Sequence, residues 1–182
     1  MVGHTAVRYY VMGERSVEEL ATDEEIQQMA EIVGESMDSG AVGFSTNRYP
    51  PHVGPDGRSI PGTYAEAKEL LEIAKVVGQK RGLMQNVLDF GGQPEFSVNL
   101  LKDMASTTGD RILFSIGAGP DLASGKRVRN LLKELCKEGC DIICISQPSS
   151  SGFMFGLQSG LPFPGETWEK LRQMNIELRL SS

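Results

Sequence analysis

The sequence has few of the residues that build metal sites, and no segment of the kind that spans a membrane. Among its 182 residues there are only two histidines, His4 and His52. A catalytic zinc ion usually takes three protein ligands, most of them histidine. We therefore expect no complete metal site in this chain alone. No apolar run approaches the roughly 20 residues of a membrane span, and no basic segment followed by an apolar core opens the chain. We expect neither a membrane partner nor a signal peptide.

Positive charge is also scarce. The formal net charge is −6, with 18 basic against 24 acidic side chains. This balance argues against nucleic acid or an anionic membrane as the main partner. The three cysteines, Cys136, Cys140 and Cys144, do not have the two-residue spacing of zinc or many iron–sulfur sites. Their odd number predicts reduced, buried thiols in a reducing compartment, and hence a cytoplasmic location.

Four segments have the apolar periodicity and the terminal signals of helices. They are 21–40, 63–82, 93–109 and 125–139, and each ends in a glycine. Thr22 with Glu25, and Thr63 with Glu66, have the spacing of capping boxes. Pro94 suits a first helical turn. A glycine at the end of each segment suits the left-handed position that terminates a helix.

A short apolar run follows each of these glycines. The runs are "AVGFST", "LMQNVLDF", "RILFSIG" and "DIICISQP". They predict strands buried on both faces, as in a parallel sheet. "AVRYYVMG" at 6–13 is a further candidate strand, because Val7, Tyr9 and Val11 alternate.

Repeated βα units leave two architectures open, the (β/α)8 barrel and the doubly wound sheet. A complete barrel takes about 250 residues, and the chain has 182. The expected fold class is therefore α/β, a partial (β/α)8 TIM barrel of four to five βα units. We expect residues 1–182 to form a single domain.

Polar side chains follow the predicted strands, at the ends where parallel α/β folds bind ligands. They are Ser45, Thr46, Asn47 and Arg48, then Asn86 and Asp89, then Ser115, then Ser146 and Gln147. Arg48 can grip a carboxylate with two hydrogen bonds, and Asn86 can pair with an amide. A proline- and glycine-rich loop at 47–62 contains His52. The alternative is that these residues only satisfy backbone groups and cap helices.

Two other motifs have competing interpretations. His4 and His52 suit proton transfer near neutral pH, although each alone is more typical of a structural or solvent-exposed residue. "SIGAGPDLASGKR" resembles a phosphate-binding loop ending in Gly125-Lys126. Its spacing is one residue too long, and Arg127 stands where a serine or threonine would bind magnesium. A helix-capping loop is the favoured interpretation, with a weak anion site as the alternative.

Two longer stretches carry a family resemblance. "VGHTAVRYYVMG", followed by "ATDEEIQQMAEIVGESMDSGAVGFST" and the proline-rich loop, resembles the D-aminoacylase-like branch of the metal-dependent amidohydrolases. The similarity is most specific over 2–48 and weakens beyond about residue 90. It implies a distorted (β/α)8 barrel that hydrolyses N-acyl-D-amino acids. It also implies zinc or another divalent metal, which polarises the amide carbonyl and activates a water.

The resemblance also implies that much of the machinery lies elsewhere. The family's His-x-His pair and metal-bridging residue would precede Met1, and its late aspartate would follow Ser182. Two strands that often carry a histidine ligand, here "LMQNVLDF" and "RILFSIGAG", have none. Only Gly3-His4, Arg8 and the Gly43–Thr46 strand end carry over, near the active-site mouth. No catalytic residue and no metal ligand is assigned.

The sequence therefore predicts an internal segment of an amidohydrolase that hydrolyses an amide C–N bond. The expected ligand is a small-molecule amide, and the predicted substrate-binding residues are His4, Ser45, Arg48, His52 and Asn86. The isolated segment is expected to be inactive. It is also expected to self-associate, because a partial barrel leaves open sheet edges. The alternative is a non-catalytic binding or assembly module derived from such a barrel.

Overall fold

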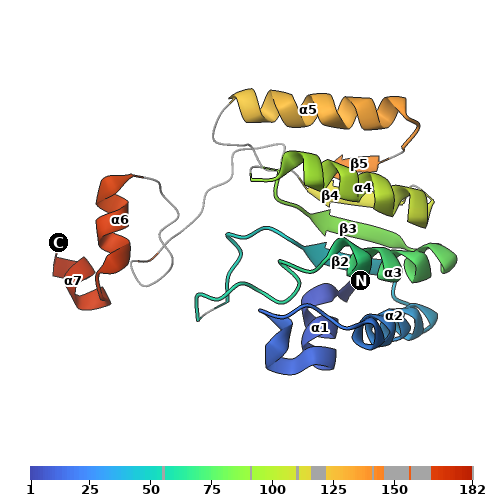
Figure 1. The fold of residues 1–182 in the computed structure, drawn as a ribbon, viewed down its shortest axis with the longest axis horizontal. Helices are drawn as coiled ribbons and strands as arrows, with labels where there is room; N and C mark the ends of the chain where they lie inside the picture. Colours follow the sequence, from blue (N-terminus) through green and yellow to red (C-terminus); the bar gives the residue numbers. More distant parts are fainter. Residues whose placement is uncertain are drawn as a thin grey trace.

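Five parallel strands form one sheet whose order follows the chain (Figure 1). The computed structural model describes residues 1–54, 56–90, 92–109, 111–115, 122–140, 142–145, 156 and 165–181. The predictions for Ser146 and Gln147 lie outside these residues. The strands are β1 (Val2–Gly3), β2 (Gly43–Asn47), β3 (Leu83–Val87), β4 (Ile112–Ser115) and β5 (Ile142–Ile145). Four of them fall on the four apolar runs, as the sequence predicts.

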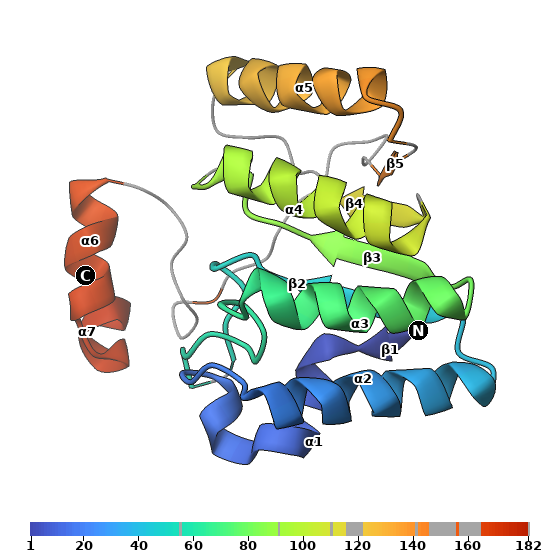
Figure 2. The same cartoon turned by 45° about the vertical axis from the view of Figure 1, so that its right-hand side comes forward.

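The main helices lie along one face of this sheet. They are α2 (Asp23–Asp38), α3 (Ala67–Gln79), α4 (Pro94–Thr108) and α5 (Leu122–Lys137). Figure 2 shows them side by side in front of the strands. A doubly wound sheet would reverse its strand order and carry helices on both faces. Sequential order with helices on one face is the arrangement of part of a β/α barrel. The expected fold class is confirmed.

The two predicted capping boxes have different outcomes. At the start of α2, Thr22 Oγ1 accepts from the Glu25 amide at 3.2 Å, and Glu25 Oε2 accepts from the Thr22 amide at 2.9 Å. The second box is wrong, because α3 begins only at Ala67. Thr63 instead donates its hydroxyl to the Ile60 carbonyl at 2.9 Å. The hydroxyl is used within the preceding turn and does not cap the helix.

The glycines that follow the helices do not all adopt the left-handed conformation that ends a helix. Gly109 caps α4 in the left-handed conformation, with φ of 72°, as predicted. After α3, the left-handed residue is Arg81, with φ of 57°, so Gly82 is not the predicted stop. A Cβ at Gly82 would lie 2.2 Å from Cε of Met37. A side chain at position 82 would therefore require Met37, at the end of α2, to move.

The predicted strand at 6–13 is wrong, since these residues lie within helices. They belong to α1 (His4–Met12) and to the first residue of the 3-10 turn η1 (Gly13–Ser16). The buried residues of α1 are His4, Val7, Arg8 and Met12, at helical spacing, while Tyr10 is 81% exposed. Residues that favour strands therefore form a helix because its buried face packs against the body of the molecule.

The sheet buries one of its faces more completely than the other. The buried strand residues Phe44, Met84, Ile112 and Phe114 belong to one core cluster with residues of α2 to α5. The residues that alternate with them are only half-buried on β2, β3 and β4. On β5, Ile143 is 58% exposed. The prediction that the strands are buried on both faces is wrong, because the main helices cover one face only.

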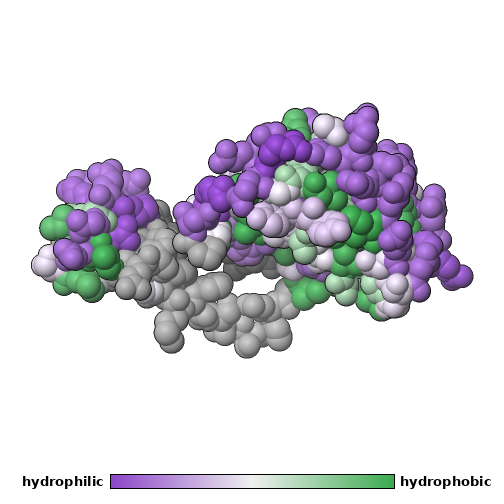
Figure 3. Space-filling model, turned by 90° about the horizontal axis from the view of Figure 1, so that it is seen from below, coloured by the Kyte–Doolittle hydropathy of each residue, from purple (hydrophilic) through white to green (hydrophobic). Residues whose placement is uncertain are grey.

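The surface carries hydrophobic side chains in several places. Figure 3 shows green residues reaching the surface of the main body, among hydrophilic ones. Cys136 and Cys144 are exposed and Cys140 is partly buried, all as free thiols. The predicted burial of the thiols is therefore wrong for two of the three. The last helices, α6 (Glu166–Gln173) and α7 (Ile176–Ser181), stand apart from the sheet and bury no residue (Figure 1). Among the described helices, none combines the length and the hydropathy that a bilayer crossing requires.

Candidate functional site

Polar side chains gather where β1, β2 and β3 end, as the sequence predicts. His4 is the first residue of α1 and directly follows β1. Arg48 follows β2, and its amide donates to the Val87 carbonyl at the end of β3 at 2.7 Å. These three strands are neighbours in the sheet. The structure thus brings the predicted residues of β1 to β3 to the same end of the sheet. They form two groups there, a closed group that is buried and an open group that is accessible to solvent.

The closed group centres on His4, which is 1% exposed. Its Nδ1 lies 2.9 Å from Oγ1 of Thr46, and its Nε2 lies 2.6 Å from Oε1 of Glu69. The imidazole also packs against the Phe44 ring, with 5.4 Å between centroids. Both ring nitrogens of His4 are therefore occupied by protein partners.

Arg8 completes the same group. Its Nη1 donates to the second carboxylate oxygen of Glu69. Its Nε donates to the Ser16 carbonyl at 2.9 Å, and its Nη2 donates to the Glu19 carbonyl at 2.5 Å. Each guanidinium nitrogen has an acceptor, and Arg8 and Glu69 are each 2% exposed. We call His4, Arg8, Thr46 and Glu69 the His4 cluster.

The protonation of the His4 cluster follows from its burial. Desolvation lowers the pKa of His4 below its ordinary value of 6.5, against the opposing effect of Glu69. Burial acts to raise the pKa of Glu69, but the hydrogen bond from His4 and the hydrogen bond and charge of Arg8 together lower it. A neutral imidazole protonated on Nε2 satisfies the cluster: it donates to ionised Glu69 and accepts at Nδ1 from the Thr46 hydroxyl.

Sequence reasoning missed Glu69, although the sequence holds a signal for it. Glu69 lies four and eight residues before Ile73 and Val77, which are both fully buried. Helical spacing places these three residues on one face of α3. An acidic side chain on an apolar face must be paired, because an isolated buried charge is too costly. That position could have predicted a buried basic partner.

The open group centres on Arg48, which is only partly buried. Its Nη1 donates to the Ala65 carbonyl, and its guanidinium carbon lies 5.4 Å from the centroid of the Phe96 ring. Phe96, in the first turn of α4, is 42% exposed. Desolvation lowers the pKa of Arg48, the charge of Glu69 opposes this effect, and the charge of Arg8 adds to it. Arg48 forms no ion pair with any described carboxylate.

Ser45, within β2, and His52, in the loop after it, have fewer protein partners than His4. Ser45 is partly buried, and its hydroxyl donates to the Val2 carbonyl at 3.5 Å. His52 is exposed, with Nδ1 lying 2.5 Å from Nδ2 of Asn47. The Tyr49 ring meets it edge-on, at 5.1 Å between centroids. These residues connect the loop to β2 and leave most of the imidazole accessible.

Asn86 was expected at the open end of the sheet, but it is fully buried. It pairs in register with Thr46 on one side and Phe114 on the other. Its Nδ2 donates to the Leu113 carbonyl at 3.3 Å, while Oδ1 has no hydrogen-bond partner. In this structure Asn86 is not accessible to a ligand in solvent.

No protein-family model matches the chain. It is 34% identical over 83 residues to D-aminoacylase of Alcaligenes xylosoxydans xylosoxydans, a stretch that is 46% of this chain and 15% of that protein. A solved D-aminoacylase structure, from work on its binuclear metal centre, matches 82% of this chain with a TM-score of 0.67 and 21% identity. A second, described as defining a novel subset of amidohydrolases, matches with a TM-score of 0.66 and 22% identity.

The chain is D-aminoacylase-like in both sequence and fold. The predicted resemblance is confirmed over the matched residues. The chain covers only 30% of the D-aminoacylase chain in the structural match. What the whole protein does is therefore a separate question from the likeness of this part.

Among the described residues, no group of side chains suits a metal centre. In the described ranges, no three His, Cys, Asp or Glu side chains come together in a way that could hold a metal ion. His4 has no free ring nitrogen, because Thr46 and Glu69 occupy both. The nearest carboxylate, Glu69, is already paired with Arg8. A metal ion would have to break the His4 cluster in order to bind there.

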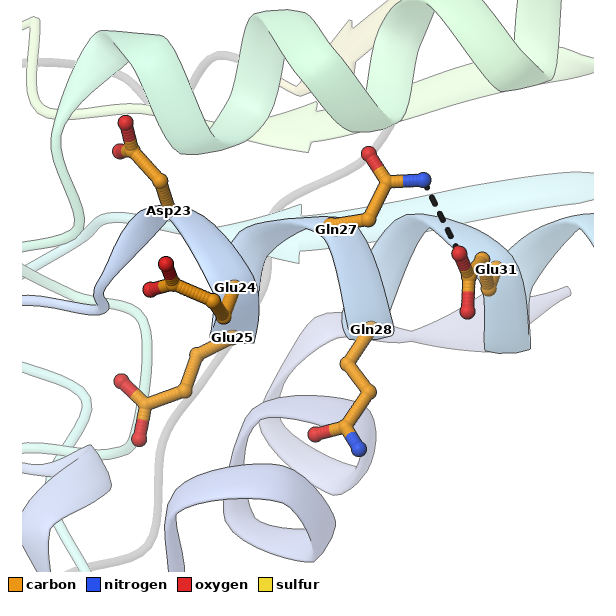
Figure 4. A pocket seen from close by; sticks show the side chains of 6 residues that line it. All are labelled: Asp23, Glu24, Glu25, Gln27, Gln28 and Glu31. Atoms are coloured by element: carbon orange, nitrogen blue, oxygen red, sulfur yellow. Dashed lines mark hydrogen bonds between the residues drawn. The ribbon is translucent and has the colours of Figure 1, made fainter.

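Two other surface features carry no site. Figure 4 shows a shallow depression at the start of α2, lined by residues of that helix alone. Its acidic and amide side chains project outward from the helix surface, and Gln27 donates to Glu31 at 3.0 Å. Gly125 and Lys126, the end of the suspected phosphate loop, lie within α5. The rest of that segment, residues 116–121, lies outside the described residues.

Proposed function

We propose that this chain forms part of a metal-dependent amidohydrolase that hydrolyses an amide C–N bond, with N-acyl-D-amino acids as the substrate class. The observation that supports the proposal is the position of Ser45, Arg48 and His52. Arg48 and His52 lie beyond the carboxyl end of β2, and Ser45 lies two residues before it, near the end of the sheet where β/α barrels bind ligands. The likeness to D-aminoacylase over 83 residues points to the same chemistry.

Within this proposal the predicted residues act in two ways. Arg48, His52 and Ser45 would contact the substrate, because each has an accessible surface. His4 and Asn86 would act from behind the site, because both are buried. His4 would hold Thr46, and with it the end of β2, in place. The zinc or other divalent metal would be bound by residues outside this chain, so the chain alone would be inactive.

Binding tests the proposal directly. The isotope-labelled chain is titrated with N-acetyl-D-leucine and with N-acetyl-L-leucine, and backbone amide signals are followed by NMR. We expect shifts confined to residues 45–52 and their neighbours, with tighter binding of the D-enantiomer. Equal binding of the two enantiomers, or no binding, would contradict the proposal. In a parallel assay with zinc, release of free D-leucine at ordinary enzyme rates would contradict the claim that the chain alone is inactive.

The second candidate is a non-catalytic assembly module, and one observation favours it. The edge strand β5 exposes Ile143 and Ile145, at 58% and 45%. We propose that β5 of one copy pairs with β1 of a second copy, since only that pairing keeps the strands parallel. Light scattering at micromolar concentration should show a dimer, and Ile143→Lys should give a monomer. A monodisperse monomer for the unmodified chain would rule this out.

The three free cysteines suit a reducing, cytoplasmic setting.

A further inference from the structure

We propose that Arg48 and Phe96 form a binding site for a small organic monocarboxylate with an apolar group beside its charge. The inference deepens the proposed function, because it names the part of a substrate that this end of the sheet would hold. It is argued from the charge, the geometry and the accessibility of Arg48. None of these depends on amide hydrolysis.

The charged side chains around Arg48 do not balance one another. Three ionised side chains influence one another at the ends of β1 and β2: Arg8, Glu69 and Arg48. Glu69 is paired with Arg8 within the His4 cluster, and the neutral imidazole adds no charge. Arg8, Glu69 and Arg48 together therefore carry one excess positive charge, and Arg48 forms no ion pair with a described carboxylate, although the charge of Glu69 acts on it. A partly desolvated cation is stabilised by an anion that reaches it.

The guanidinium of Arg48 is held in a fixed orientation by its neighbours. The Ala65 carbonyl accepts from Nη1, and the Phe96 ring lies across the guanidinium at 5.4 Å. The backbone of Arg48 is fixed to β3 through the Val87 carbonyl. The side chain is thus oriented before any ligand arrives, which reduces the entropic cost of binding. Its Nε and Nη2 have no described acceptor, so donors remain for a carboxylate.

The single charge of Arg48 and the exposed ring of Phe96 indicate the class of ligand. A single guanidinium offers one positive charge, which matches a monocarboxylate better than a multiply charged phosphate. Phe96 is 42% exposed, so its ring has free apolar surface next to the cation. A ligand with an apolar or flat group close to its carboxylate can cover that surface. Benzoate and N-acetylglycine have this chemistry, and N-acetylglycinamide is the neutral counterpart of the second.

The experiment is an NMR titration of the full chain with benzoate, N-acetylglycine, N-acetylglycinamide and inorganic phosphate. We expect both carboxylates to shift the signals of Arg48 and its neighbours, with binding that weakens as salt is added. The neutral amide should bind at least tenfold more weakly than N-acetylglycine. Arg48→Gln should weaken carboxylate binding at least tenfold, and Phe96→Leu should weaken benzoate binding severalfold.

Arg58→Gln is the matched control. Arg58 lies in the same loop but is exposed and already pairs with Asp56 and Glu14, so its loss should leave carboxylate binding unchanged. If Arg48→Gln does not fold, Arg48→Lys and Phe96→Leu provide the test, because both keep the charge. The inference is overturned if the unmodified chain binds neither carboxylate, if the neutral amide or phosphate binds as tightly, or if the Arg48 variants bind normally.

The outcome also separates this inference from the proposed function. Carboxylate binding that depends on Arg48, combined with equal binding of D- and L-acyl amino acids, supports the site and contradicts the amidohydrolase proposal. If the Arg48→Gln variant still prefers the D-enantiomer, the result supports the amidohydrolase proposal and contradicts the Arg48 site. In that case the carboxylate would be held elsewhere.

Discussion

Arg8 and Arg48 lie close to the same end of the sheet, yet their surroundings are opposite. Arg8 is 2% exposed, and all three of its guanidinium nitrogens have acceptors. Arg48 is partly buried, has one hydrogen bond and rests on an aromatic ring. A fully buried charge must be paired or it destabilises the fold. A cation at the surface can stay unpaired, so only Arg48 is available to a ligand.

The strongest test of this contrast removes the charge of Glu69. Glu69→Gln leaves Arg8 buried without a counterion and removes the carboxylate that His4 donates to. Breaking a buried pair by removing one partner costs about 3–5 kcal/mol. We expect the free energy of unfolding, measured in urea, to fall by about this amount.

A control for Glu69 lies one turn further along α3. Glu72 pairs with Lys75 at 2.6 Å, and both side chains are exposed. Surface pairs of this kind contribute about 0–1 kcal/mol, so Glu72→Gln should change stability little. Equal losses in the two variants would mean that the His4 cluster is no more important to the fold than a surface pair.

The next largest effect is expected at Thr46. Thr46→Val keeps the shape of the side chain but removes the hydroxyl that donates to Nδ1 of His4. A buried acceptor left without its partner costs about 1–3 kcal/mol. The loss should appear in urea unfolding at pH 7.5. Thr107→Val serves as the comparison, because Thr107 is only partly buried and its hydroxyl donates to the Asp103 carbonyl of its own helix. A Thr46→Val variant as stable as the original chain would show that His4 does not need this donor.

The pH dependence of stability tests the neutral state of His4. The folded pKa of His4 lies below its ordinary value of 6.5, so the unfolded chain takes up the proton first as the pH falls. The free energy of unfolding should therefore be steady above about pH 6.5 and decrease below it, by at most about 1.4 kcal/mol per pH unit for one proton.

Glu69 acts in the same direction at lower pH. Its folded pKa is lowered from 4.5, so its stabilising contribution is present above that pH and is lost as the pH falls further. His4→Gln should remove the decrease between pH 6.5 and 4.5 and leave the steeper loss below. Urea midpoints at half-unit intervals measure both. A His4→Gln variant with the original profile would assign the titration to other groups.

The contrast between the two arginines shows what the sequence could predict. Local signals were sufficient for β2 to β5, each of which lies in an apolar run, and for the Thr22 cap, because Thr22 and Glu25 are neighbours in the sequence. The same reasoning failed for Thr63, whose hydroxyl donates instead to the Ile60 carbonyl across the turn that contains Pro61 and Gly62. The Pro-Gly pair predicts that turn, but the capping-box spacing alone does not take it into account. The pairing of His4 with Glu69 joins residues 65 positions apart. No local pattern reports such a distance, and only the fold brings the two side chains together.

The prediction that Asn86 is accessible to a ligand was wrong for a related reason. Strand ends were correctly placed at one edge of the sheet, but the face on which each side chain lies depends on alternation along the strand. Thr46 and Asn86 share a register position and both are buried. Arg48 lies just beyond the strand, where alternation no longer applies. Its accessibility depends on the loop that returns to Ala65, which no periodicity describes.

The smallest expected effect is at His52, and it marks the limit of the open group. His52 is exposed and touches only Asn47 and Tyr49 among the described residues. Surface substitutions of this kind usually change stability by no more than about 0.5 kcal/mol, and we expect this of His52→Ala in urea unfolding. Its carboxylate binding should also persist, because the charge on Arg48 is untouched. A clear loss of stability would place His52 in the structural part of the site. A loss of binding at unchanged stability would instead extend the ligand site from Arg48 into the loop.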